Sequence, residues 1–98
     1  MKGRFVLKPR ARQDLDEIWD YTADRWGLGQ AEAYARQLWE DIQRVADNPS
    51  FGRECGEVRP GYRKYPSGSH VPYYRLTDDG IDIVRILHER MDHERHIP

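Results

Sequence analysis

The sequence predicts a single α+β domain in the order β-α-α-β-β-β, with a helical hairpin packed on one face of a small antiparallel sheet. Three observations support this fold class. Apolar residues recur at helical spacing in the first half of the chain and alternate at strand spacing in the second half, and short turns rich in Pro and Gly separate the predicted strands. With 98 residues in total, the chain is expected to form one domain, residues 1–98.

The first predicted elements are a short strand and a helix. Residues 4–8 have the composition of a strand that Pro9 closes, and proline also suits the first turn of the helix that follows. The apolar stripe of this helix has spacings of four, three and four residues and consists of Ala11, Leu15, Ile18 and Thr22. Gly27 is placed to cap the end of the helix.

A second helix is predicted after a short loop at residues 27–29. Its apolar face consists of Ala31, Ala35, Leu38, Ile42 and Val45. The helix ends before Asn48 and Pro49, because a residue that precedes proline avoids the helical region. A loop this short makes the two helices antiparallel neighbours.

Three strands are predicted in the second half of the chain, at residues 58–65, 69–76 and 81–88. The segments between them read Pro-Ser-Gly and Asp-Asp-Gly, which are typical of hairpin turns. Consecutive strands joined by such turns pair antiparallel, and this predicts the sheet on which the helical hairpin packs.

Strict alternation in the last strand creates two faces. If Val84 and Ile86 point towards the helices, three apolar side chains point the other way, with Arg85 among them. These are Ile81, Ile83 and Leu87. Two explanations of this apolar row stay open: the chain's own charged tail covers it, or a partner protein binds it.

Charge is unevenly distributed along the chain. The net charge is −1 and the pI is about 6.4, which argues against binding of nucleic acid by this chain, yet residues 58–77 contain no Asp or Glu. This basic segment predicts a surface for an anionic or acidic partner, although its arginines can equally be solvated residues that protect a sheet edge. The candidate target-binding residues are Arg59, Arg63, Lys64, Arg75, Arg85 and His88.

The sequence predicts neither a cofactor nor a metal site. Cys55 is the single cysteine, which excludes a disulfide framework and fits a reducing compartment. His88 and His93 are five residues apart and do not form a zincin pair, and His93 with His96 lacks a third ligand. No apolar stretch approaches the length of a membrane span or a signal sequence, so we expect a cytoplasmic protein without membrane contact.

Three segments carry a family resemblance that spans nearly the whole chain. They are LKPRARQDLDEIWDYTADRWG, GYRKYPSGSHVPYYRL and IDIVRILHERMDHERH. They resemble the RelE/ParE superfamily of toxins from bacterial toxin–antitoxin modules, and the similarity is greatest to its ParE branch. The resemblance implies a growth-inhibiting toxin that forms a hetero-oligomer with a ParD-like antitoxin and inhibits DNA gyrase by binding, without catalytic residues of its own.

An antitoxin needs an apolar surface on the toxin, and the margins of the helical stripes together with the apolar row of the last strand offer one. The predicted antitoxin-binding residues are Trp19, Trp39, Ile81, Ile83 and Leu87. A segment of the antitoxin that folds on binding would lie across them.

Two other functions stay open. The RelE branch, which this chain also resembles, cleaves ribosome-bound mRNA with clustered Lys and Arg residues. Here a phosphate-binding cluster would consist of Arg59, Arg63, Lys64 and Arg85. Only His88, His93 and His96 would then be left for proton transfer, since no Tyr follows Tyr74. The other function is that of an inactive toxin fold that only co-represses its operon with the antitoxin.

Overall fold

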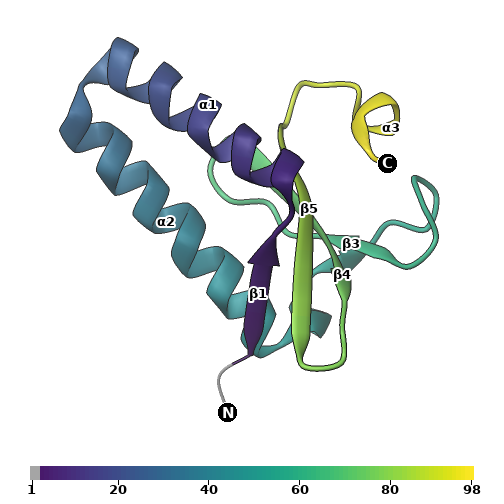
Figure 1. Cartoon of the computed structure of the whole chain (residues 1–98). Coiled ribbons are helices and arrows are strands. Elements are labelled where there is room, and N and C mark those ends of the chain that lie inside the picture. Colours follow the sequence, from purple (N-terminus) through teal and green to yellow (C-terminus); the bar gives the residue numbers. More distant parts are fainter. Residues whose placement is uncertain (1–2) are drawn as a thin grey trace.

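The computed structural model describes residues 3–98 and has the predicted α+β architecture (Figure 1). In chain order the elements are β1 (Arg4–Leu7), α1 (Pro9–Trp26), α2 (Leu28–Asp47), the short 3-10 turn η1 (Pro49–Phe51), β2 (Arg53–Glu54), β3 (Tyr62–Lys64), β4 (His70–Leu76), β5 (Gly80–His88) and α3 (His93–His96). The hairpin of α1 and α2 packs on one side of the sheet, and α3 lies on the other side. We call these two sides the helix face and the tail face.

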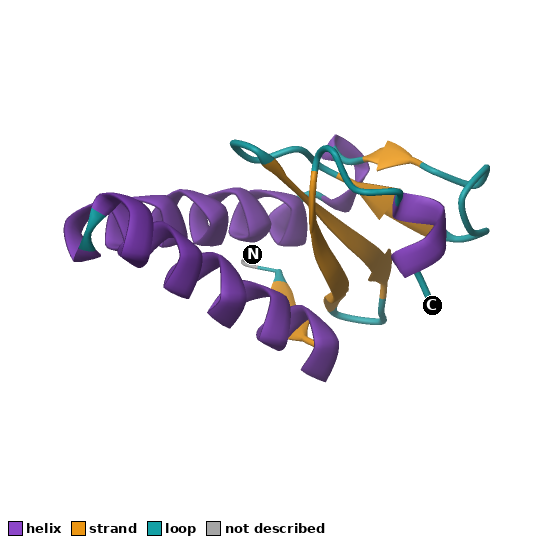
Figure 2. Cartoon of the chain, turned by 90° about the horizontal axis from the view of Figure 1, so that it is seen from above, coloured by secondary structure: helices purple, strands orange, loops and turns teal. Residues whose placement is uncertain are grey.

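The two long helices form as predicted, but the joint between them is shorter. Gly27 alone separates them, with a φ of 94° that side chains rarely adopt. Most of the predicted stripe residues are buried, but Leu15 in α1 and Ala35 in α2 are only half-buried, and Asp14 is buried in the stripe of α1 instead. In the view from above, the tip of the hairpin projects well beyond the sheet (Figure 2).

The sheet is mixed, whereas a purely antiparallel sheet was expected. Its strand order is β1-β5-β4-β3-β2, and β1 runs parallel to β5 while the other neighbours are antiparallel. After β1, the chain forms the hairpin of α1 and α2 on the helix face. β1 itself lies at the edge of the sheet, beside the last strand, β5. β2 was not predicted because two residues are too few to show a pattern, and β3 is shorter than the predicted strand at 58–65.

A β-bulge interrupts the pairing of β4 with β5. Tyr73 pairs with Arg85, but the next residue, Tyr74, pairs with Ile83. Val84 is therefore an extra residue in β5, and it shifts the alternation of side chains by one position. From this point on, the faces of β5 differ from those that strict alternation predicts.

The bulge corrects the prediction of one apolar row on the face away from the helices. Ile81 and Ile83 belong to the helix-face core together with Ile86, and they are 1% and 0% exposed. Leu87 lies on the tail face instead, where Ile97 of the C-terminal tail packs with it. The row is thus divided between two faces, and of the two explanations left open, packing by the chain's own tail applies to Leu87.

Candidate functional site

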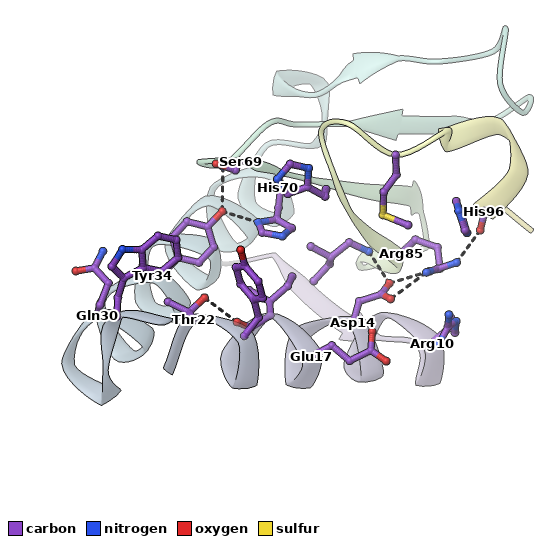
Figure 3. A pocket seen from close by; sticks show the side chains of 16 residues that line it. Arg10, Asp14, Glu17, Thr22, Gln30, Tyr34, Ser69, His70, Arg85 and His96 are labelled. Carbon is purple, nitrogen blue, oxygen red and sulfur yellow. Dashed lines mark hydrogen bonds and ion pairs between the residues drawn. The ribbon is translucent and has the colours of Figure 1, made fainter. Parts of the chain in front are cut away.

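An open groove of about 570 Å³ runs along α1, between the helical hairpin and the ends of β4 and β5 (Figure 3). Tyr34 and His70 lie at one end, and Arg85 with His96 lies at the other. The apolar part of the lining consists of Ile18, Tyr21, Trp26, Tyr34, Ile86 and Met91. An open groove with mostly apolar walls and a few polar groups is the usual form of a binding site.

Two aromatic side chains of the groove are unusually exposed. Tyr21 and Trp26 are each 60% exposed, and their rings meet edge to face at 6.1 Å. The guanidinium of Arg25 lies 5.2 Å from the centre of the Trp26 ring, and Leu28 is exposed beside it at the tip of the hairpin. Large, rigid aromatic side chains of this kind are typical anchors of protein–protein interfaces.

A buried ion pair closes the other end of the groove. Arg85 donates from Nε and Nη2 to the two carboxylate oxygens of Asp14, at 2.7 and 2.9 Å, and both side chains are less than 10% exposed. Arg85 also donates from Nη1 to the His96 carbonyl at 2.9 Å, and Asp14 accepts the backbone N–H of Ile86. The pair therefore joins α1, β5 and the tail, and the expectation that Arg85 faces a target is wrong.

The opposite end of the groove holds two neighbouring imidazoles. The Nδ1 atom of His70 lies 2.6 Å from the Tyr34 hydroxyl, and its ring lies 5.2 Å from that of His88. Burial and the nearby His88 lower the pKa of His70 to about 4, so its ring is neutral at neutral pH. Burial likewise raises the pKa of Tyr34, which keeps its proton.

The turn between β3 and β4 forms this end of the groove because it is fixed to α2. Ser67 donates its hydroxyl to Asp41 at 2.6 Å, and the backbone N–H of Ser69 donates to the Tyr34 hydroxyl at 3.0 Å. Gly68 has a φ of 60°, and a Cβ atom there would lie 2.7 Å from the Tyr34 ring. The predicted Pro-Ser-Gly turn thus also positions Tyr34 and His70.

The predicted basic residues do not form one surface. Alternation places Lys64 and Arg75 on the tail face with Tyr73, and Arg63 on the helix face with Tyr74. Arg63 is also engaged in the fold, since it donates to the carbonyl of Gly52 at 2.7 Å and forms an ion pair with Glu54. Arg75 is freer: it is 47% exposed and has one longer ion pair to Asp82, at 3.6 Å.

Two further cations lie near β2 and β3. They are Arg59, which was a predicted target-binding residue, and Arg53, which was not. Arg59 is exposed in the turn before β3 and donates to the carbonyl of Val58. Arg53 pairs with Lys64 across β2 and β3, so it belongs to the same tail-face surface. We call Arg53, Lys64 and Arg75 the tail-face cations.

The predicted tryptophans lie outside the groove. Trp39 packs edge-on against Phe5 at 4.9 Å, beside a separate depression along β1, and Trp19 is half-buried on α1. Their role in binding an antitoxin stays a prediction. Tyr21 and Trp26 are the exposed aromatics that line the groove, and their place at the end of α1, next to Gly27, was the signal in the sequence.

The histidines of the tail have structural contacts. His93 contacts the Tyr73 hydroxyl through Nδ1 at 2.5 Å and the His88 carbonyl through Nε2 at 2.9 Å. Burial raises the pKa of Tyr73 to about 12, so its hydroxyl stays protonated. These contacts hold α3 against the tail face.

Residues 3–98 contain neither a metal cluster nor a helix that could span a membrane. No group of three or more His, Cys, Asp or Glu side chains in this range is arranged to hold a metal ion. No helix in the same range combines the length and the apolar character that a membrane span needs.

Comparison with known proteins gives a consistent result. Residues 5–93 match the family model described as the ParE toxin of the type II toxin–antitoxin system parDE. Toxin ParE1 of Mycobacterium tuberculosis H37Rv is 54% identical over 98 residues, covering 99% of this chain and 100% of that protein. Toxin ParE1 of Caulobacter vibrioides is 43% identical over 93 residues, covering 95% and 96%.

Solved structures share the fold at lower identity. A chain of the chromosomal ParDE system of P. aeruginosa superposes with a TM-score of 0.76 and 20% identity, covering 89% of this chain and 96% of that chain. The YoeB dimer of Staphylococcus aureus gives a TM-score of 0.62 and 15% identity, covering 90% and 98%. At these identities the likeness concerns the fold alone.

Proposed function

Because the chain belongs to the ParE toxin family of type II toxin–antitoxin systems, we propose that a ParD-like antitoxin neutralises it through the groove and that it inhibits DNA gyrase by binding. The ParE resemblance of the three sequence segments is confirmed by the family match over residues 5–93. Binding of the antitoxin and of gyrase is proposed beyond this family membership.

The exposed aromatic lining of the groove is the observation that carries the antitoxin proposal. Tyr21 and Trp26 leave most of their surface in water, although they border an apolar groove of about 570 Å³. Contiguous apolar surface of this kind marks a protein interaction site. An amphipathic helix of the antitoxin would place its apolar residues between α1 and the sheet, as helices do in grooves of other complexes.

Two observations support binding to the target over catalysis. A phosphate-cleaving site needs cations close to a proton donor and acceptor. Here Arg85 is buried against Asp14, while Arg63 and Lys64 point to opposite faces of the sheet. The cations and histidines of the RelE-like alternative are therefore distributed over separate surfaces.

The tail-face cations are the proposed contact with the target, so we expect Arg75→Glu to abolish growth inhibition. The fold should tolerate the change, because Arg75 is exposed and its ion pair with the half-buried Asp82 is long, at 3.6 Å, and ion pairs at the surface contribute about 0–1 kcal/mol. Growth after induction and thermal melting measured on the same variant separate these two effects.

Arg36→Glu is the matched control, since it reverses one charge and removes one exposed ion pair, with Glu32, on α2 outside the groove. It should stay toxic. If Arg75→Glu remains as toxic as Arg36→Glu, these residues are solvated edge residues and the target binds elsewhere.

A further inference from the structure

We propose that His70 and His88 form a carboxylate-binding subsite in the groove, which accepts an Asp or Glu side chain of the bound antitoxin segment. The inference rests on the proposed function, since it assumes that the groove holds the antitoxin. It adds a chemical requirement for one residue of that partner.

The protonation of His88 follows from its backbone contact. Its Nδ1 atom accepts the backbone N–H of Arg90 at 3.1 Å. A nitrogen that accepts a hydrogen bond carries no hydrogen, so the proton of the neutral ring is on Nε2. A hydrogen on Nδ1 would direct two N–H groups at each other, so the contact with Arg90 leaves Nε2 as the N–H donor of His88.

Tyr34 fixes the same tautomer in His70. The Tyr34 hydroxyl accepts the backbone N–H of Ser69 at 3.0 Å and lies 2.6 Å from His70 Nδ1. Its own hydrogen is best placed on this short contact, because the other acceptor, the carbonyl of Ser67, is 3.4 Å away. His70 Nδ1 therefore accepts, and its Nε2 also carries a hydrogen.

Both Nε2–H groups are unpaired and accessible. Neither Nε2 atom has a hydrogen-bond partner within the described part of the chain. No buried side-chain nitrogen or oxygen of these residues lacks a partner, so the two Nε2 atoms are not buried. Both residues line the groove, so the free donors open into it. The ring centroids are 5.2 Å apart and the ring planes are nearly perpendicular, at 88°, so the two imidazoles are close enough for one carboxylate to lie against both.

The surroundings favour an acidic side chain as the occupant. The two rings offer donors only, which excludes a Lys or Arg side chain, and an apolar side chain would bury both N–H groups without acceptors. The nearby charges are largely balanced: Asp14 is paired with Arg85, and Arg10 and Glu17 both line the groove. Glu89 acts on His70 only as a lesser charge than burial and His88.

Affinity for the antitoxin co-expressed from the same operon tests the subsite. We expect His88→Leu to weaken binding about 10- to 100-fold, the usual effect of losing a hydrogen bond to a charged group. His88→Gln keeps an N–H donor, so its affinity should stay within about threefold of that of the native chain. This change is smaller than the loss of one hydrogen bond to a charged group. Gln37→Leu, an exposed position on α2 outside the groove, is the control for an added leucine.

Histidine NMR of the native chain provides a second readout that needs no variant. A carboxylate beside Nε2 favours the imidazolium, so the pKa of His70 should rise from about 4 when the complex forms. Its Nδ1–H would then donate to Tyr34, whose hydroxyl can turn to Ser67. Since the pKa is higher in the complex, affinity should increase as the pH falls through the raised value and decrease as the pH rises.

The possible outcomes are distinguishable. Equal affinities for His88→Leu and Gln37→Leu, or a His70 pKa that stays at about 4 or falls in the complex, would overturn the subsite and leave the antitoxin proposal intact. Failure of the native chain to bind the co-expressed antitoxin at all would overturn the proposed function and the subsite with it.

Discussion

Replacement of Asp14 by alanine is expected to lower the free energy of unfolding by about 3–5 kcal/mol. The change leaves the Arg85 guanidinium buried with only the His96 carbonyl and no opposing charge. It also removes the acceptor of the Ile86 N–H. A domain of this size is stable by about 5–15 kcal/mol in total, so denaturation by urea, followed by circular dichroism, should show a large shift of the midpoint.

The double variant Asp14→Leu with Arg85→Met is the informative companion. It removes both charges together, and apolar replacements of buried ion pairs are often neutral or stabilising. We expect it to recover most of the loss. Arg36→Ala, which breaks the exposed pair with Glu32, should cost less than about 1 kcal/mol. An Asp14→Ala protein as stable as Arg36→Ala would contradict the structural role of the pair.

The second large effect concerns the two exposed aromatic side chains of the groove. Tyr21→Ala combined with Trp26→Ala should weaken antitoxin binding about 1,000-fold, since aromatic anchors at interfaces commonly contribute about 2 kcal/mol or more each. Both side chains are largely exposed in the free chain, so its own stability should change little. Calorimetric titration of the purified antitoxin measures the affinity, and failure of the antitoxin to restore growth reports the same loss in cells.

Two further variants locate the binding surface. Phe51→Ala removes an exposed aromatic side chain that lines neither depression and serves as the matched control. Trp39→Ala tests the surface that was predicted from the sequence, beside Phe5. If Trp39→Ala greatly weakens antitoxin binding while the double variant of Tyr21 and Trp26 binds normally, the antitoxin binds along β1 and not in the groove.

The helices could be predicted because their signals are local. Pro9 and Gly27 mark the ends of α1, and the apolar spacing between them is set by one helical period. The faces of β5 could not be predicted in this way. The extra residue Val84 follows from the pairing of β5 with Tyr73 and Tyr74 on the neighbouring strand, and this pairing decides which isoleucines are buried.

The candidate site was predicted less completely than the fold, for two physical reasons. The cations were grouped by sequence, although neighbours in a strand such as Arg63 and Lys64 must face opposite sides. Asp14 was missed because its partner Arg85 is 71 residues away. Its position in α1, three residues after Ala11 and four before Ile18, does place it in the buried stripe, and that spacing was the available signal.

The proposed action of this chain on gyrase, by binding alone, can be measured with purified components. Purified chain is added to DNA gyrase with supercoiled DNA, and covalent gyrase–DNA cleavage complexes are counted with and without the antitoxin, beside a purified translation reaction. We expect cleavage complexes to accumulate, to disappear when the antitoxin is added, and translation to continue. Unchanged gyrase together with cleavage of ribosome-bound message would contradict the account and favour the RelE-like endonuclease.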